Sequence, residues 1–338
     1  MAPEAFPPIV DLTRPEAPGL IDAACRTVGF FQVVGHGIPQ ALIESVFGVA
    51  DGFFGQPLTE KMTWSSGLPE IERGYSAKGT EGLGYTLDLE QPPDLFEALT
   101  FGREVLSDDP AFHAAEHHFF APNIWPTTPE NLRPTLLEYW DSVQRLVHRI
   151  TSLMAAALGL DDDYFEPFTD TAVEALRINY FEGRPGETAM PNQFGVGPHT
   201  DYGIITVLLA DQEPALQVYT DRGEWQYVVP APGALVVNVG DLLSRWTNDR
   251  WRSTLHRVIP VLSDDNTIRR RRSVPFFHEG NFDALIECLP TCADADNPAK
   301  YAPITGGDHV YSKVMAGRLL EVAGAESTLG DRTAGLAD

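Results

Sequence analysis

The sequence predicts an α+β protein in which a largely helical N-terminal half supports a C-terminal antiparallel β-sandwich or barrel. Residues 129–160 carry apolar side chains at helical spacing, which predicts a long amphipathic helix. After residue 173, short β-rich segments recur between turn signals, a pattern typical of sandwiches and barrels. The chain has 338 residues, of which 43% are hydrophobic, so it can bury a large core and global disorder is excluded.

The expected elements follow one another along the chain without a repeat of fixed period. Gly35-His36-Gly37 predicts a turn before a helix that begins near Pro39. Residues 64–106 are rich in glycine, proline and acidic residues, and we expect a long loop with short strands there. The N-terminal elements are a strand over 8–12, a helix over 15–28, a strand over 29–34 and a helix over 39–63. The later β-rich segments are 175–181, 203–209, 216–220, 225–229, 234–239, 253–261 and 273–278.

These elements divide the chain into two regions of one compact unit. We expect residues 1–172 to form a support region of helices and strands that includes a long active-site loop. Residues 173–323 are expected to form the β-rich core, closed by a helix near 308–323. The remaining residues, 324–338, are rich in glycine, alanine and aspartate, and we expect a disordered tail.

Charge and composition exclude several classes of partner. The chain has 24 Lys and Arg against 48 Asp and Glu, a net charge of −24 that repels nucleic acids and anionic membranes, so neither is expected as a partner. No apolar run approaches the ~20 residues that span a bilayer. The N-terminus also lacks the basic and apolar regions of a signal peptide, and we expect a soluble, cytoplasmic protein. The sequence carries no signal for an oligomeric state, and three cysteines are expected to be free thiols: Cys25, Cys288 and Cys292.

The segment Gly197-Pro-His199-Thr-Asp201-Tyr-Gly203 carries the first chemical signal. Alternate side chains of a strand share a face, so His199 and Asp201 are expected to point the same way. His256, in Ser253-Thr-Leu-His-Arg-Val258, is the best candidate for a third ligand from a distant strand. Two imidazoles and one carboxylate form the facial triad of non-haem Fe(II) oxygenases, which leaves open coordination positions. The alternative is a solvent-facing Asp201 beside two histidines that are merely buried in strands.

The segment Arg271-Arg272-Ser273-Val-Pro-Phe-Phe-His-Glu-Gly-Asn281 carries the second signal. Strand alternation places Arg271 and Ser273 on one face, where a guanidinium beside a hydroxyl can bind a carboxylate. The alternative, that arginines only solubilise an edge strand, is favoured for Arg269, Arg270 and Arg272. For Arg271 we therefore favour a carboxylate-binding role.

Several further motifs occur in the order found in one known family. They are Pro8-Ile-Val-Asp-Leu12, Gly29-Phe-Phe-Gln-Val-Val-Gly-His-Gly-Ile38, Arg73-Gly-Tyr75, Asn123-Ile-Trp-Pro126, Arg177-Ile-Asn-Tyr180 and Val239-Gly-Asp241. Over roughly residues 7–320 the chain resembles the iron- and 2-oxoglutarate-dependent oxygenases of the isopenicillin N synthase-like group. The resemblance implies a distorted double-stranded β-helix (jelly-roll) core with flanking N-terminal and C-terminal helices. It also implies His199, Asp201 and His256 as iron ligands, and Arg271 with Ser273 as the binding site for the distal carboxylate of 2-oxoglutarate.

The chain departs from many of these relatives at Phe181, where they carry a tyrosine that helps to hold the cosubstrate. Asn179 is retained, and we expect it to contribute to cosubstrate binding. Three residues are further candidates for substrate contact: Phe101, Phe276 and His278.

The resemblance implies an oxidoreductase that uses Fe(II), O₂ and 2-oxoglutarate to hydroxylate, desaturate or cyclise a small-molecule metabolite, with release of succinate and CO₂. A second reductant is expected because Fe(II) alone cannot deliver four electrons to O₂. The breadth of the family suggests a substrate from secondary metabolism. Two alternatives stay open at this point: a cosubstrate-independent oxidase of the isopenicillin N synthase type, and a non-catalytic jelly-roll binding protein.

Overall fold

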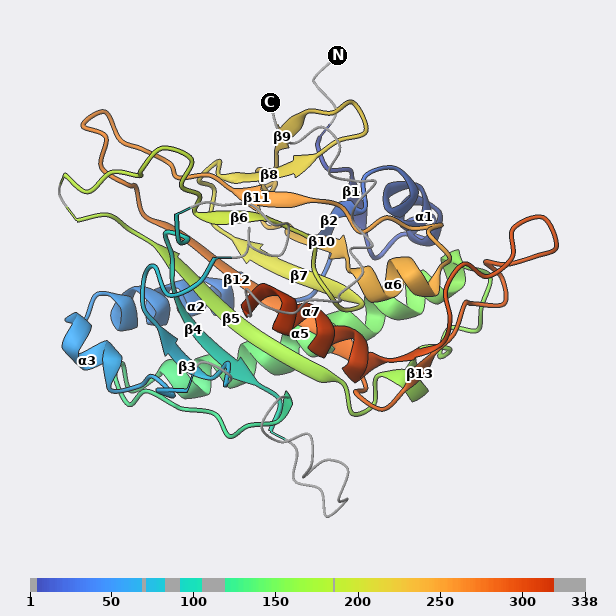
Figure 1. The fold of residues 1–338 in the computed structure, drawn as a ribbon, viewed down its shortest axis with the longest axis horizontal. Coiled ribbons are helices and arrows are strands. Elements are labelled where there is room, and N and C mark those ends of the chain that lie inside the picture. The colour runs from blue at the N-terminus through green and yellow to red at the C-terminus, as the bar shows by residue number, and fades with distance from the viewer. Residues whose placement is uncertain (1–4, 69–70, 83–91, 105–118, 185, 319–338) are drawn as a thin grey trace.

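The computed structural model describes residues 5–68, 71–82, 92–104, 119–184 and 186–318, and within these ranges the fold is built on two facing β-sheets (Figure 1). In spatial order, the eight-stranded sheet of this part contains β1 (Ile9–Asp11), β2 (Phe30–Val34), β10 (Leu235–Val239), β7 (Ile205–Ala210), β12 (Arg271–Gly280), β5 (Val173–Phe181), β4 (Glu97–Gly102) and β3 (Gly74–Ser76). The smaller sheet contains β6 (Val196–His199), β11 (His256–Val258), β8 (Leu216–Tyr219) and β9 (Trp225–Tyr227). A separate pair is formed by β13 (Leu285–Ile286) and β14 (Ile304–Thr305).

The two sheets pack face to face through apolar side chains. One buried cluster contains Phe30, Phe181 and Val236 from the large sheet, and Val196, Val218 and Val258 from the small sheet. Neighbouring strands are antiparallel, apart from the parallel pair of β1 and β2. Strands of the N-terminal region, β1 to β4, therefore share one sheet with strands of the C-terminal region.

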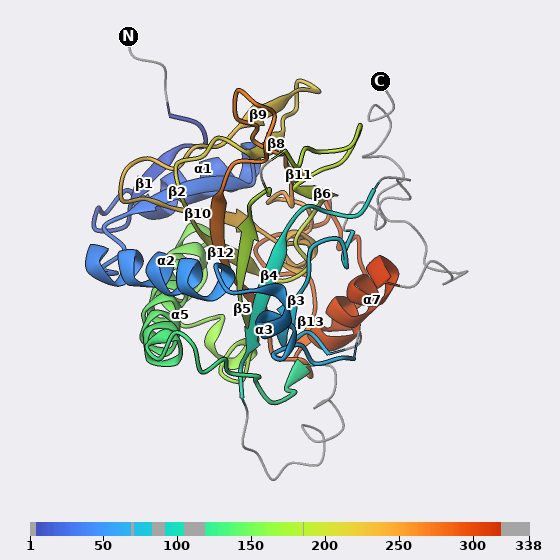
Figure 2. The same ribbon diagram turned by 90° about the vertical axis from the view of Figure 1, so that its left-hand side faces the viewer.

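Helices flank the large sheet. Figure 2 shows α2 (Gln40–Phe54) and α5 (Leu132–Ala157) on one side of its strands and α7 (Gly306–Arg318) on the other. The apolar stripe of α5 packs on this sheet, where Trp140 meets Phe276 of β12 with ring centroids 5.0 Å apart. The remaining described helices are α1 (Ala17–Thr27), α3 (Leu58–Met62), the 3₁₀ turn η2 (Glu166–Phe168) and α6 (Asp241–Trp246).

The structure refines the sequence-based expectation at three places. The helix expected over 39–63 is divided, because Pro57 disfavours a helical residue before it and starts α3 instead. The short strands expected within the loop over 64–106 are β3 and β4, and β4, six residues long, lies between β5 and β3 in the large sheet. The final helix begins at Gly306, while residues 319–323 and the expected disordered tail lie outside the described residues. Among the helices of the described ranges, none has the length and hydropathy needed to cross a bilayer.

Candidate active site

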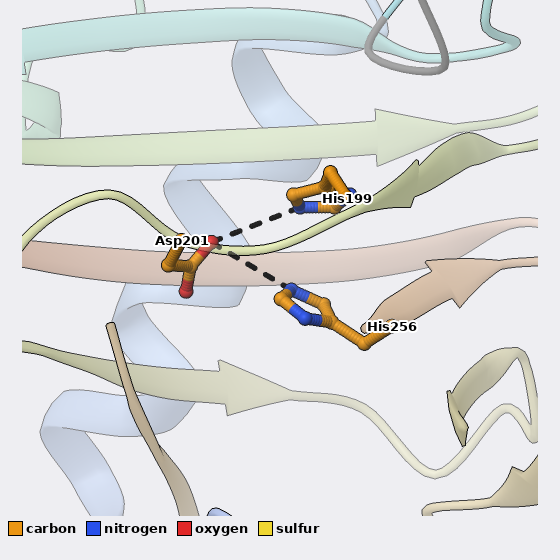
Figure 3. Close-up of side chains that lie close together, drawn as sticks. All are labelled: His199, Asp201 and His256. Carbon is orange, nitrogen blue, oxygen red and sulfur yellow. Dashed lines mark ion pairs between the residues drawn. The ribbon is translucent and has the colours of Figure 1, made fainter. Parts of the chain in front are cut away.

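His199, Asp201 and His256 converge at one end of the small sheet. β6 ends at His199, so Asp201 lies in the loop after the strand and not in the strand itself. The antiparallel register of β6 and β11 places His256 directly opposite His199, with ring centroids 4.3 Å apart. One potential ligand atom from each of the three residues lies within 4.8 Å of the others. Figure 3 shows both imidazoles directed at the same carboxylate.

Backbone carbonyls orient the two imidazoles. Nδ1 of His199 lies 2.7 Å from the carbonyl oxygen of Gly197, and Nδ1 of His256 lies 3.1 Å from that of Thr254. When Nδ1 carries the proton for these bonds, Nε2 of each ring keeps its lone pair. A hydrogen bond of this kind fixes the tautomer and the ring plane of a metal-binding histidine.

Two side chains hold the Asp201 carboxylate in the same way. Asn238 donates from Nδ2 to Oδ2 of Asp201 at 2.7 Å, and Thr206 donates from its hydroxyl to the same oxygen at 2.5 Å. The second oxygen, Oδ1, faces the histidines, 3.7 Å from Nε2 of His199 and 3.6 Å from Nε2 of His256. All three free ligand atoms thus point to one position.

The protonation states suit a metal ion. Burial and the neighbouring His256 lower the pKa of His199 to about 4, so this imidazole is neutral at pH 7. Burial acts to raise the pKa of Asp201, but the two histidines and the hydrogen bonds from Asn238 and Thr206 outweigh it, and the pKa is lowered overall. Neutral imidazole and ionised carboxylate are the forms that bind metals, so the residues present fit an iron ion.

The three residues face a cavity of about 990 Å³ between the sheets. One wall of the cavity is formed by alternate side chains of β12: Arg271, Ser273, Pro275, Phe277 and Glu279. The loop after β6 contributes Tyr202, and α7 contributes Val310 and Tyr311 at another side. The cavity is large enough for a small organic substrate beside a cosubstrate.

Arg271 and Ser273 form the pair expected from strand alternation. Arg271 is only 3% exposed, and its Nη1 donates to the hydroxyl of Ser273 at 3.2 Å. Its Nε has no hydrogen-bond partner among the described residues, which leaves a buried donor for an anionic ligand. Burial lowers the pKa of Arg271 to about 10, so the guanidinium stays charged at pH 7.

Asn179 lies beside this pair. It is the cross-strand neighbour of Ser273 in the register of β5 and β12, and it lines the cavity. Its Oδ1 accepts a hydrogen bond from Nε of Arg177 at 3.0 Å, and this orients its Nδ2 amino group. Arg177 is itself held by Glu81, to whose two carboxylate oxygens its Nη2 donates at 2.7 Å.

Phe181 supports Arg271 from the apolar layer between the sheets. The guanidinium carbon of Arg271 lies 5.1 Å from the centroid of the Phe181 ring, and Phe181 is 4% exposed. A cation at this distance from an aromatic face is attracted to the ring. Phe181 is not among the side chains that line the 990 Å³ cavity.

The structure does not bring the three candidate substrate residues to the cavity. Phe101 stacks on Trp125 with ring centroids 4.1 Å apart, inside the large core. Phe276 and His278 project from the opposite face of β12; Phe276 packs against α5, and His278 Nδ1 lies 3.1 Å from Oε1 of buried Glu174. The physical reason is strand alternation, since even-numbered residues of β12 face away from Arg271.

Sequence reasoning missed the residues that take these places on the cavity wall. Counting by twos from Arg271 selects Pro275, Phe277 and Glu279, and the structure places all three in the wall. Tyr202 also lines the cavity, although no sequence pattern marked it as more than structural.

Comparison with protein families identifies the group to which this arrangement belongs. Residues 7–128 match the family described as non-haem dioxygenase in morphine synthesis N-terminal, and residues 172–280 match the 2OG-Fe(II) oxygenase superfamily. The chain belongs to the 2OG-Fe(II) oxygenase superfamily. It is therefore an oxidoreductase of the dioxygenase type, with Fe(II) and 2-oxoglutarate as its cofactor and cosubstrate.

Individual relatives extend over most of the chain. The 2-oxoglutarate-Fe(II) type oxidoreductase hxnY of Emericella nidulans is 36% identical over 323 residues, which cover 92% of this chain and 89% of that protein. Homoarginine-6-hydroxylase 2-ODD-233 of Oryza sativa subsp. japonica is 34% identical, with 88% of each chain covered. A full-length Neurospora crassa protein, crystallised in complex with alpha-KG, has a TM-score of 0.80 and 29% identity, covering 94% of this oxygenase and 98% of that chain. The same Neurospora crassa protein has also been crystallised with alpha-KG and thymine.

Proposed function

We propose that this oxygenase hydroxylates, desaturates or cyclises a small metabolite, and that its iron is held by His199, Asp201 and His256. The observation that carries the proposal is the convergence of these ligand atoms on a cavity that also contains the buried guanidinium of Arg271. When bound, Fe(II) with 2-oxoglutarate supplies the activation of O₂, with release of succinate and CO₂. The two facing sheets are, in our interpretation, a distorted double-stranded β-helix with flanking helices.

The role that we assign to Arg271 and Ser273 is to bind the distal carboxylate of 2-oxoglutarate. A guanidinium with a free Nε beside a hydroxyl offers two donors to one carboxylate, and burial shields this contact from water. The Nδ2 amino group of Asn179, oriented by Arg177, is placed to donate a further hydrogen bond. The cosubstrate would then lie along β12, with its keto-acid end toward the three metal-binding residues.

The protein's other contribution is a shaped cavity. Phe277, Tyr202 and Phe96 give the cavity aromatic walls against which an organic substrate can pack. Relatives with names such as "Clavatol oxidase claD" and "Azadirone synthase LFS" support a substrate from secondary metabolism, because these proteins are 33% and 32% identical to this chain.

The test is substrate oxidation with Fe(II) and O₂, with 2-oxoglutarate supplied or withheld and succinate measured. A first panel contains homoarginine and thymine, the compounds named for two relatives. We expect one succinate for each substrate molecule oxidised, and no oxidation without 2-oxoglutarate. Oxidation at full rate without 2-oxoglutarate and without succinate would replace this proposal with a cosubstrate-independent oxidase.

A further inference from the structure

Two buried polar atoms in the cavity wall have no hydrogen-bond partner among the described residues. They are Nε of Arg271, a donor, and Oε2 of Glu279, an acceptor. Buried polar groups in folded proteins almost always have a hydrogen-bond partner. We therefore expect a bound ligand to supply the partner of each of these two atoms. 2-Oxoglutarate accounts for Arg271. Glu279 has the opposite charge and needs a different ligand.

Glu279 lies at the metal end of the cavity, away from Arg271. Both residues are on β12, where eight positions at ~3.3 Å each separate their Cα atoms by roughly 26 Å along the strand. The Glu279 carboxylate packs over Gly203, where a Cβ atom would overlap with it. Because Gly203 follows Asp201 by two residues, Glu279 lies next to the loop that carries a metal-binding carboxylate.

The basic side chains of the cavity are already engaged elsewhere. Arg73 donates to the carbonyl oxygens of Glu72, Phe119 and Ala121, at 2.7 to 3.0 Å. Arg177 is paired with Glu81. In the described part of the cavity, Glu279 is therefore left without a cation from the protein, and its charged neighbours include Asp201, Glu72 and Asp241, all acidic.

We propose that Glu279 is a substrate-binding residue and that the substrate carries a cationic nitrogen group, such as an amine, guanidinium or amidinium, which pairs with its carboxylate. This inference rests on the proposed function, since it assigns a substrate class to the same cavity. A cationic group donates a hydrogen bond to the unpaired Oε2 of Glu279 and also offsets the negative charge of the neighbouring carboxylates. A neutral donor would supply only the hydrogen bond. Burial and the acidic neighbours raise the pKa of Glu279 to about 8, so without a ligand the carboxyl group is largely protonated at pH 7, and a bound cation would favour its ionised form.

The test uses three aromatic probes of matched size and shape: benzamidine, which is cationic, benzamide, which is neutral, and benzoate, which is anionic. Their binding to the iron-loaded protein with 2-oxoglutarate is measured by calorimetry under nitrogen, so that no turnover occurs. We expect benzamidine to bind at least tenfold more tightly than benzamide, and benzoate to bind weakest. The Glu279→Gln variant, which keeps the shape of the side chain, should lose this preference while its affinity for 2-oxoglutarate stays unchanged.

A control removes the same charge outside the cavity. Glu213 pairs with Arg269 on the surface, at 2.7 Å, so Glu213→Gln should keep the preference for benzamidine. The inference is overturned if benzamidine does not bind at millimolar concentration, if benzamide binds as tightly, or if Glu279→Gln keeps the preference. Failure of the iron-loaded protein to bind 2-oxoglutarate would instead contradict the proposed function, so the two failures are distinguishable.

Discussion

Replacing Arg271 by alanine should weaken the binding of 2-oxoglutarate by roughly 10–150-fold. The Arg271 side chain is buried, one of its nitrogens is hydrogen-bonded to Ser273, and its Nε is free for a ligand. A charge-assisted hydrogen bond to a carboxylate is typically worth ~1.5–3 kcal/mol, and each 1.4 kcal/mol is about tenfold in affinity. Burial keeps this contact from being screened by solvent, so we expect the upper part of the range.

Calorimetric titration of 2-oxoglutarate into the iron-loaded, oxygen-free protein measures this effect without turnover. Arg270→Ala is the matched control, because its side chain is 49% exposed and lies 3.7 Å from Asp51, outside the cavity wall. The control removes the same charge from the same strand end and should change the affinity by less than about twofold. Equal losses in the two variants, or no loss in Arg271→Ala, would refute the assignment of Arg271 to the cosubstrate.

Four further predictions concern the candidate metal ligands, a residue that orients one of them, Glu279 of the cavity wall, and Phe181. His256→Ala should abolish stoichiometric Fe(II) binding, measured by metal analysis after dialysis, because one of three ligands is lost. Asn238→Ala should weaken Fe(II) binding by roughly 10–100-fold, since it removes a hydrogen bond that orients Asp201. In the metal-free protein, the pKa of Glu279 is raised to about 8, so the free energy of unfolding should fall as the pH rises from about 4.5 to 8. In urea unfolding experiments, the Glu279→Gln variant should lack this fall. Identical pH profiles of the two proteins would contradict the prediction. Phe181→Tyr should change the KM for 2-oxoglutarate by no more than roughly tenfold, because one neutral hydrogen bond is worth about 0.5–1.5 kcal/mol.

The three candidate metal ligands could be selected from the sequence, but the reason for their convergence could not. Strand alternation predicted that His199 and Asp201 share a face, yet Asp201 lies beyond the end of β6. The loop after β6 and hydrogen bonds from Thr206 and Asn238 orient the Asp201 carboxylate toward the two histidines. His256 is placed by the register of β11 against β6, which depends on pairing between strands distant in sequence.

The substrate side of the cavity was harder to predict for a specific physical reason. The middle of β12, residues 274–277, is apolar on both faces, because one face packs on α5 and the other lines the cavity. Hydrophobicity therefore does not distinguish Phe276 from Phe277. Only the alternation counted from Arg271 separates them. A polar residue at the next cavity-facing position, Glu279, therefore carries more functional information than either phenylalanine.

The distribution of charge inside the cavity explains how a chain with a net charge of −24 can accept an anionic cosubstrate. At long range the protein repels 2-oxoglutarate, so binding must depend on a short-range contact in a site of low dielectric constant. In the proposed assignment Arg271 provides that contact at one end of β12, where its Nε is a buried donor without a partner among the described residues. With its distal carboxylate at Arg271, the cosubstrate would direct its keto-acid end toward His199, Asp201 and His256, as proposed above. At the metal end of the cavity, the unpartnered Oε2 of Glu279 is the atom that we propose to pair with a positively charged substrate.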